Sequence, residues 1–352
     1  MRIVMVAWVT EAADRFEQNL PLLFGGRRNQ QLGQTEAIEL VFIDGFERLP
    51  EAYLAQLRDS GYAPHNAAPI LQRHAQRFTT LDRFGAYGKF CFLRWLVLAE
   101  LYAGEPLLHV DGDVVFNESP TALAQQFKGF TLVLQGCPAV TAIADPSWFR
   151  QYETELIALA RDVDSYTTQA LRQRTGWEGS ARTKWAGSWD RSYFGHDQDL
   201  ISHLIHTDRI VQADPAIFMT SASGYVFFEN PLLIGDLVAD RPLIYERVAA
   251  IDYLNSRRIA FWHMQTDWCR YLVKHLVRKR LNALAGTGRV PFGEGDWEGL
   301  LARALRRLTP SRIFSRAAIY RQFFEKGDFS EVFTDRAWWQ ANVFSANPGK
   351  HR

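Results

Sequence analysis

Short apolar runs alternate along the chain with longer stretches in which apolar residues recur every three or four positions. The short runs are rich in Val and Ile and end at polar or Gly residues, which predicts strands buried on both faces. The longer stretches predict helices, with Asp145-Pro146 as a start signal and Gly61 or Gly104 as stop signals. Gly25-Gly26 predicts a turn. Strands are expected at 3–8, 38–43, 106–110, 131–134, 210–212, 225–228 and 258–263, and helices at 49–60, 89–102, 119–127, 145–160, 197–206 and 242–256.

This alternation of strands and helices predicts an α/β fold with a mostly parallel sheet, in which ligands bind beyond the carboxyl ends of the strands. A chain of 352 residues is long enough for one large core with a smaller appendage. The segment from residue 270 onward contains sixteen Lys or Arg residues and only seven Asp or Glu residues, and the spacing of its apolar residues is mostly helical. We therefore expect a catalytic domain over 1–268 and a basic helical region over 269–352.

Charge, cysteine content and hydropathy argue against a nucleic-acid-binding, a disulfide-bonded or a membrane-spanning protein. The formal net charge is +1, which gives no indication of nucleic-acid binding. Cys91, Cys137 and Cys269 are far apart and lie in apolar or mixed sequence, so they are expected to be reduced thiols. No apolar stretch approaches the roughly 20 residues of a transmembrane helix, and the N-terminus does not read as a signal peptide. These features predict a soluble, cytoplasmic protein.

The most informative stretch is an acidic pair that follows an apolar strand. Asp111 and Asp113 flank Gly112, and apolar residues continue after them. A glycine at this point lets a metal or ligand approach the backbone, and carboxylate oxygens are the ligands that Mg²⁺ and Mn²⁺ prefer. A short Asp-x-Asp on its own more often forms a capped turn. Two like charges at the end of a buried strand favour the cation site instead.

Two further motifs follow along the chain. Asp197-Gln198-Asp199 lies at the start of a predicted helix, and His263 ends a late strand. Together with Asp111-Gly112-Asp113, they resemble glycosyltransferases of the GT-A fold, most closely the retaining family that includes glycogenin and the bacterial lipopolysaccharide galactosyltransferases. The resemblance covers about residues 1–268. It implies a Rossmann-like mixed sheet flanked by helices, to which the C-terminal helical appendage is added.

The resemblance also implies roles for individual residues. Asp111, Asp113 and His263 would bind the metal, Mn²⁺ or Mg²⁺, and Asp111 would also contact the donor ribose. Asp197 and Gln198 would flank the reacting sugar. The remaining expected donor contacts are Ala7, Trp8, Val9 and Thr10 after the first strand, Lys89 on the helix before the acidic strand, and Gly112 between the two carboxylates. Arg83 belongs to a locally basic segment and is a further candidate for a phosphate contact.

The expected reaction is transfer of a hexose from a nucleotide diphosphate sugar, with UDP implied by the resemblance, to a glycan, a lipid-linked glycan or another hydroxyl acceptor. In a retaining reaction Asp197 or Gln198 would stabilise the oxocarbenium-like transition state, and in an inverting one Asp197 would be the general base. Ser202 replaces the family's usual Asn, and the Gly and Lys that often follow the late His are absent. The stereochemical outcome and the donor therefore stay open.

Two other functions were weighed against transfer. A non-catalytic nucleotide-sugar or glycan-binding protein could share the fold, but such a protein has no need for a costly cluster of acids. A sugar nucleotidyltransferase would need a Gly-rich, Arg-containing loop after the first strand, and this sequence has none there.

Three segments carry alternatives. The basic stretches 271–280 and 302–307 fit either contact with anionic lipid at the inner membrane face or a helical subdomain with a solvated basic face. The Trp- and Gly-rich segment 177–194 fits either stacking on an acceptor sugar or core packing. His203 and His206 read as helix-face histidines rather than zinc ligands.

Overall fold

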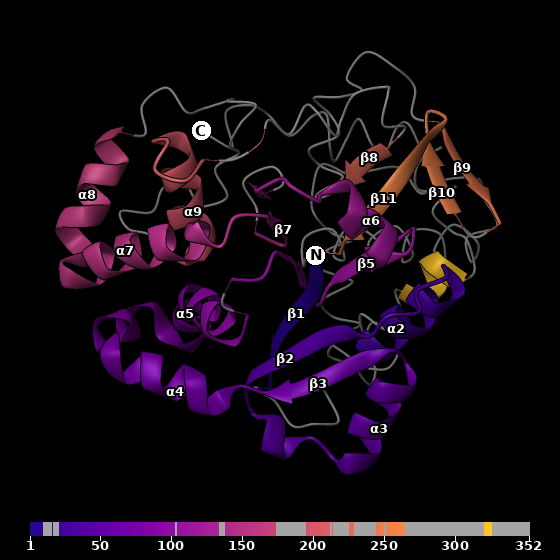
Figure 1. Ribbon diagram of the computed structural model, residues 1–352, viewed down its shortest axis with the longest axis horizontal. Helices are drawn as coiled ribbons and strands as arrows, with labels where there is room; N and C mark the ends of the chain where they lie inside the picture. Colours follow the sequence, from indigo (N-terminus) through magenta and orange to yellow (C-terminus); the bar gives the residue numbers. More distant parts are fainter. Residues whose placement is uncertain are drawn as a thin grey trace, which may run out of the picture.

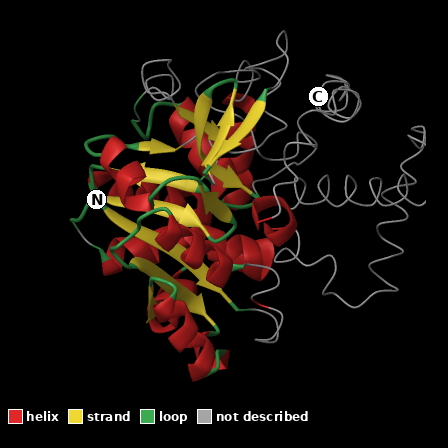
Figure 2. Ribbon diagram, turned by 90° about the vertical axis from the view of Figure 1, so that its right-hand side faces the viewer, coloured by secondary structure: helices red, strands yellow, loops and turns green. Residues whose placement is uncertain are grey.

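The computed structural model describes residues 1–9, 16, 21–102, 104–133, 138–173, 195–211, 213, 225–228, 244–249, 251–264 and 320–325. The described strands form two sheets, a larger one through the middle of the molecule and a smaller one at one end of it (Figures 1 and 2). In this part of the chain, no helix combines the length and the apolar character needed to cross a membrane.

The larger sheet has six strands in the order β3-β2-β1-β4-β7-β6. The first four are parallel to one another, whereas β7 is antiparallel to both of its neighbours. The strands are β1 (Arg2–Trp8), β2 (Ile38–Asp44), β3 (Tyr62–Asn66), β4 (Leu107–Asp111), β6 (Leu132–Val133) and β7 (Val140–Ile143). The carboxyl ends of β1, β2 and β4 therefore meet at one edge of the sheet.

Helices cover both faces of this sheet (Figure 1). One layer holds α2 (Leu22–Gln31), α3 (Glu51–Asp59) and α6 (Pro120–Gln126). The other holds α4 (Ala68–Arg77), α5 (Gly85–Leu101), α7 (Ser147–Arg161), α8 (Val163–Gln173) and α9 (Asp197–His206). Side chains of β1 alternate between the two layers, because successive residues of a strand point to opposite faces. Ile3, Met5 and Ala7 pack in the first layer, and Val4 and Val6 pack in the second.

The smaller sheet is built from β5 (Val114–Phe116), β8 (Tyr225–Phe228), β9 (Tyr245–Val248), β10 (Ile251–Leu254) and β11 (Arg257–His263). It follows the larger sheet directly in the chain, since β5 begins three residues after the end of β4. Buried Asn117, just after β5, connects this sheet internally. Its amide donates to the carbonyl oxygens of Asp252 and Ile259, and its side-chain oxygen accepts from the Asp252 N–H. The short strand β5 is thereby fixed against β10 and β11.

Asp252 is the centre of a buried polar network in the smaller sheet. Its side chain is fully buried and accepts hydrogen bonds from Tyr245 (2.6 Å), Arg247 Nε (2.6 Å) and Trp262 Nε1 (2.9 Å). Arg247 also donates to the carbonyl of Phe324, in the short π-helical turn Arg321–Glu325. The network therefore joins three strands to a segment from the predicted C-terminal region.

Replacing Asp252 by Asn is expected to destabilise the fold by about 3 kcal/mol. The wild-type carboxylate accepts hydrogen bonds from three donors, whereas the Asn amide group would turn its own N–H donors toward some of them and would carry no negative charge. Denaturant unfolding of Asp252→Asn beside wild type measures this, with exposed Asp59→Asn as the matched control. A loss below about 0.5 kcal/mol, as expected for an exposed surface site, would show that the network is not a main support of the smaller sheet.

The α/β class and the mixed sheet flanked by helices are confirmed. The predicted helices at 49–60, 89–102, 119–127, 145–160 and 197–206 are present with small changes at their ends, and so are the strands at 3–8, 38–43, 106–110, 131–134, 225–228 and 258–263. The domain boundary near residue 268 and the basic stretches 271–280 and 302–307 lie outside the described residues, as does segment 177–194.

Three local predictions are wrong. Residues 242–256 were expected to form a helix, but 245–254 hold the antiparallel pair β9 and β10. Ile210 and Val211 belong to no strand. Gly25 and Gly26 lie inside α2 instead of in a turn. A Cβ on Gly26 would stand 2.4 Å from the Ser60 carbonyl oxygen, so this glycine permits close helix packing.

Candidate metal and nucleotide-sugar site

The acidic pair lies where the larger sheet passes into the smaller one. Asp111 is the last residue of β4 and pairs in register with Val6 of β1, and its backbone N–H donates to the Ala139 carbonyl. Gly112 and Asp113 form the turn into β5. Both carboxylates therefore stand at the carboxyl edge of the parallel strands, where α/β sheets bind their ligands.

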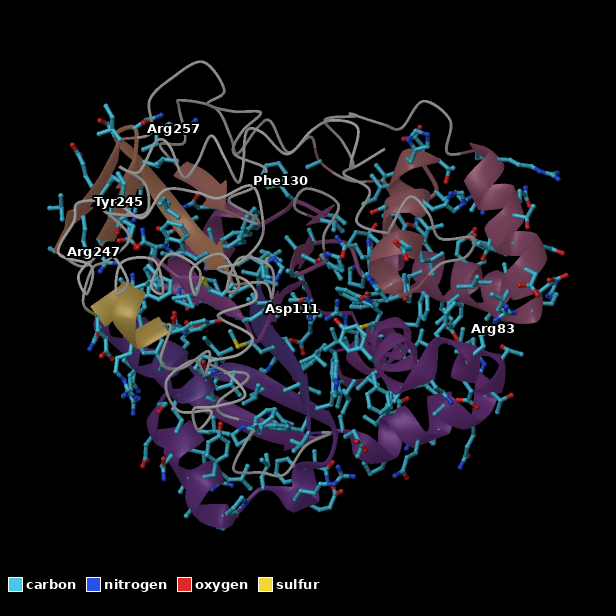
Figure 3. All side chains as sticks on the ribbon, turned by 180° about the vertical axis from the view of Figure 1, so that it is seen from behind. Arg83, Asp111, Phe130, Tyr245, Arg247 and Arg257 are labelled. Atoms are coloured by element: carbon cyan, nitrogen blue, oxygen red, sulfur yellow. The ribbon has the colours of Figure 1, made fainter. Side chains whose placement is uncertain are left out.

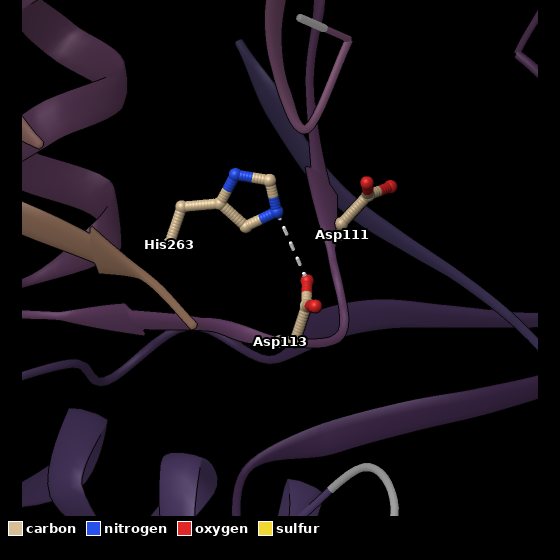
Figure 4. A group of neighbouring side chains, drawn as sticks. All are labelled: Asp111, Asp113 and His263. Carbon is tan, nitrogen blue, oxygen red and sulfur yellow. Dashed lines mark ion pairs between the residues drawn. The ribbon is translucent and has the colours of Figure 1, made fainter. Parts of the chain in front are cut away.

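Strand pairing in the smaller sheet brings His263 to this edge. β11 runs antiparallel to β5 with His263 opposite Val114, and the Met264 N–H donates to the Asp113 carbonyl at 2.8 Å. The imidazole Nε2 lies 3.3 Å from Asp113 Oδ1 (Figure 4). Backbone hydrogen bonds between β5 and β11 thus hold His263 beside Asp113, although the two residues are 150 positions apart in the chain.

Asp111, Asp113 and His263 together form a group that could hold a cation. Each offers one ligand atom, and the three atoms all lie within 4.8 Å of one another. His263 is buried and both carboxylates are partly buried, and the imidazole of His263 faces the carboxylate of Asp113 (Figure 4). Two carboxylates and one imidazole are a suitable ligand set for Mn²⁺. Mg²⁺ prefers oxygen ligands and would bind chiefly through the two carboxylates. The donor set therefore fits the predicted metal.

A buried arginine stands behind the metal group, and sequence analysis did not identify it. Arg94 lies in the middle of α5, and its guanidinium joins two carboxylates from different elements. Nη1 is 2.6 Å from Asp111 Oδ1, while Nε and Nη2 are 2.9 Å and 2.7 Å from Asp197 Oδ2. The geometry makes Arg94 the physical connection between the acidic pair and the start of α9.

Asp197 is almost completely buried at the first position of α9. Its Oδ2 also accepts a hydrogen bond from Trp95 Nε1 at 2.8 Å. Burial acts to raise the pKa of Asp197, but the Arg94 guanidinium, the His196 side chain and the Trp95 hydrogen bond outweigh it and lower the pKa to about 2. The carboxylate is therefore charged at neutral pH and holds little proton affinity.

The other titratable groups around Arg94 respond differently. Burial raises the pKa of Asp111, opposed by Arg94 and reinforced by the neighbouring charge of Asp113. Burial would lower the pKa of Arg94, but Asp111 and Asp197 raise it well above the ordinary value, so the guanidinium stays charged. His109, fully buried on β4 and in contact with the Pro138 carbonyl through Nδ1, has its pKa lowered well below normal, chiefly by burial. It is neutral at physiological pH.

A close backbone crossing fixes the start of α9 against α5. A Cβ on Gly88 would stand 2.6 Å from the carbonyl oxygen of Gly195, closer than side chains approach a backbone. The Gly195 N–H donates to Asp199 Oδ2 at 2.7 Å. Gly88 therefore allows the segment before Asp197 to lie directly on α5, which sets the distance over which Arg94 reaches Asp197. Gln198 follows on α9 and is partly exposed.

The end of β1 supplies one candidate donor contact with an accessible side chain. Trp8 is partly exposed, whereas Ala7 and Val9 are buried in the core. The Val9 backbone is already engaged, because its N–H donates to the Asp44 carbonyl and its own carbonyl accepts from Arg48. Thr10 lies outside the described residues. Of the three described residues Ala7, Trp8 and Val9, Trp8 is therefore the best placed to meet a ligand through its side chain.

Neither Lys89 nor Arg83 is directed at the metal group. Lys89 pairs with Asp82 at 2.5 Å, and Arg83 forms a two-pronged ion pair with Asp164 of α8. Figure 3 shows Arg83 among the outer helices, far from Asp111. The donor contact predicted for Lys89 and the phosphate contact predicted for Arg83 therefore involve side chains that this structure pairs with Asp82 and Asp164, whereas Arg94 holds the position next to Asp111.

Comparison with known proteins gives one structural likeness. The sequence matches no protein-family model, and no curated protein has a similar sequence. Among solved structures, the chain is similar to the apo crystal structure of mouse xyloside xylosyltransferase 1, with 12% sequence identity and a TM-score of 0.36 over 58% of this chain and 80% of that one. Likeness at this level does not establish a shared activity.

Proposed function

We propose that this protein is a metal-dependent glycosyltransferase that moves a hexose from a nucleotide diphosphate sugar, UDP being the expected nucleotide, to a hydroxyl acceptor. The observation that carries the proposal is the group of Asp111, Asp113 and His263, whose ligand atoms gather at the carboxyl edge of a mixed α/β sheet. This is where such folds bind nucleotides. The resemblance of the three motifs to the glycogenin and galactosyltransferase family supports the same reaction.

The bound cation would supply positive charge to the diphosphate that leaves when the glycosidic bond breaks, a contribution of several kcal/mol in such reactions. Asp113, His263 and Asp111 would hold it with one ligand atom each. Trp8 at the end of β1 would lie beside the nucleoside, because β1 and β4 are adjacent and end at the same edge.

The buried chain of contacts from Asp111 through Arg94 to Asp197 would orient the reacting groups. Asp197 lies behind Arg94 and is ionised by it, so we propose that its charge is electrostatic and positional. A carboxylate with a pKa of about 2 is a weak base for an acceptor hydroxyl, because efficient general bases have pKa values nearer to the working pH. This favours the oxocarbenium-stabilising role of Asp197 and Gln198 over the inverting one.

A binding protein that kept the fold and lost catalysis is the second candidate. It would bind the nucleotide sugar through the same metal group and release it unchanged. The acceptor we propose is a glycan or a lipid-linked glycan, the latter with peripheral contact to anionic lipid through the basic stretches of 269–352. No nucleic acid is expected as a partner.

Thermal stability in the presence of nucleotide sugars tests the proposed function. A ligand that binds the folded protein at a hundred times its Kd stabilises it by about 2.7 kcal/mol, which is a measurable shift of the unfolding temperature. We expect UDP-sugars to raise this temperature with Mn²⁺ and to have little effect with EDTA. Formation of UDP over time then separates the two candidates, because only an enzyme cleaves the UDP-sugar and so produces UDP. Equal stability with every nucleotide sugar, with and without metal, would contradict the proposal.

A further inference from the structure

Four aromatic side chains lie together between the end of β1 and the start of α9. Trp8 meets Tyr87 and Phe90 of α5 edge-on, with ring centroids 5.7 Å and 5.9 Å apart and planes at 66° and 73°. Tyr87 also meets His196, the residue before Asp197, at 6.5 Å and 87°. The Tyr87 ring therefore stands between the strand end that would receive the nucleoside and the residues that would flank the sugar.

Tyr87 is unusually accessible for an aromatic residue with such neighbours. The side chain is 64% exposed, although the described large aromatic residues around it are buried or half-buried. A largely exposed ring that contacts Trp8 on one side and His196 on the other offers an aromatic surface on which a ligand could stack.

The charged groups that act on Tyr87 are Asp111, Asp197 and the guanidinium of Arg94 that joins them. The pKa of its phenol is raised above the ordinary value, first by the adjacent Cys91 thiol, then by burial of the hydroxyl end and by the negative charges of Asp111 and Asp197. Trp8, which Tyr87 contacts, lies two residues beyond Val6, the partner of Asp111 in the pairing of β1 and β4, so Tyr87 lies at the same sheet edge as Asp111. Asp197 is buried, whereas Asp111 is partly exposed. An exposed aromatic ring at the same sheet edge as a partly exposed carboxylate suits a ligand that has one apolar face and several hydroxyl donors.

We infer that Tyr87 is a stacking platform for a pyranose ring, whose C–H face lies on the aromatic ring while its hydroxyls are directed toward the sheet edge that holds Asp111. A pyranose offers hydroxyl donors around its whole rim, whereas a nucleobase offers few donors and would be better served by Trp8 and backbone groups at the end of β1. The inference rests on the proposed function and deepens it. The ring belongs to either the donor or the acceptor, since both carry a sugar.

Kinetics of Tyr87 variants test this platform in the full-length protein. Tyr87→Trp keeps an aromatic face, Tyr87→Leu keeps apolar volume without one, and Tyr87→Ala removes both. We expect Tyr87→Ala and Tyr87→Leu to raise KM for a sugar-bearing substrate by about tenfold, and Tyr87→Trp to stay within about threefold of wild type. Val248→Ala, at an exposed apolar residue of β9, is the control and is expected to leave all constants unchanged.

Binding measurements identify which sugar lies on the ring. Weaker binding of the intact UDP-sugar by Tyr87→Ala, with unchanged binding of UDP alone, assigns the donor sugar. Unchanged donor binding with a raised acceptor KM assigns the acceptor sugar. An equal loss of affinity for UDP and for the UDP-sugar would place the nucleobase on Tyr87 and overturn the inference, and so would no change in any of these constants.

A second readout keeps this inference separate from the proposed function. Saturation-transfer difference NMR with methyl α-glucoside and methyl α-galactoside detects ring stacking without metal, nucleotide or turnover. We expect transfer to the ring C–H protons in wild type and in Tyr87→Trp, and its loss in Tyr87→Ala. Absence of the signal in wild type, or the same signal in Tyr87→Ala, would refute the platform even if the protein proves to be a transferase. A positive result without metal-dependent UDP release would leave the platform standing and refute the transferase.

Discussion

Asp113→Asn is expected to reduce turnover by about a thousandfold, equivalent to roughly 4 kcal/mol of transition-state stabilisation. The substitution keeps the shape of the side chain and removes the negative charge that lies 3.3 Å from His263 Nε2. The Asp113 backbone still accepts the hydrogen bond from Met264, so the junction of the two sheets should persist. Initial rates of UDP release, at an Mn²⁺ concentration that just saturates wild type, measure the effect.

Two comparisons make this prediction specific to the metal group. Exposed Asp59→Asn carries the same chemical change on α3 and should keep wild-type turnover. Raising the Mn²⁺ concentration should recover part of the lost activity of Asp113→Asn, because a weakened site fills at higher metal. Near-normal turnover in Asp113→Asn would remove Asp113 from the metal group.

Arg94→Met is expected to lower the free energy of unfolding by about 3–5 kcal/mol and to abolish measurable turnover. Methionine fills a similar length, but it leaves the buried carboxylate of Asp197 without the cation that keeps it ionised. Asp111 loses its 2.6 Å contact at the same time. Denaturant unfolding and turnover, measured on the same preparation, give the two effects.

Arg94→Lys separates charge from geometry at this position. A single ammonium cannot reproduce the fork that contacts Asp111 through Nη1 and Asp197 through Nε and Nη2. We expect Arg94→Lys to keep more stability than Arg94→Met but to lose at least about tenfold in turnover. The double variant Arg94→Met/Asp197→Asn should be more stable than Arg94→Met alone, because the unpaired charge is gone. Equal stability of wild type and Arg94→Met would show that the bridge contributes nothing.

The metal group could be predicted from sequence because its signals are local. Asp111 and Asp113 directly follow an apolar strand, and His263 ends another. Each candidate ligand can therefore be recognised from the short apolar run that precedes it. Arg94 gave no such signal. It lies in a helix that is apolar on most sides, and its partners are 17 and 103 positions away in the chain. Lys89 on the same helix was predicted to contact the donor, and in the structure it pairs with Asp82.

The errors in secondary structure have a similar origin. Residues 245–254 include good helix formers, but pairing with β11 makes them strands, and Ala249, Asn255 and Ser256 turn the chain with positive φ values of 49°, 50° and 61°. Such angles are uncommon outside glycine and cannot be read from propensity. At Gly26 a turn was predicted where the structure has helix α2. A glycine that is needed for close packing against Ser60 cannot be told from a turn glycine by its sequence.

The metal group itself is tested most directly by diffraction from crystals of the full-length chain grown with Mn²⁺ and UDP, with data collected at the manganese absorption edge. Our account predicts an anomalous peak within ligand distance of Asp111, Asp113 and His263, with diphosphate oxygens completing the coordination. Manganese bound elsewhere, or UDP bound at the sheet edge with no metal peak beside Asp113, would contradict it.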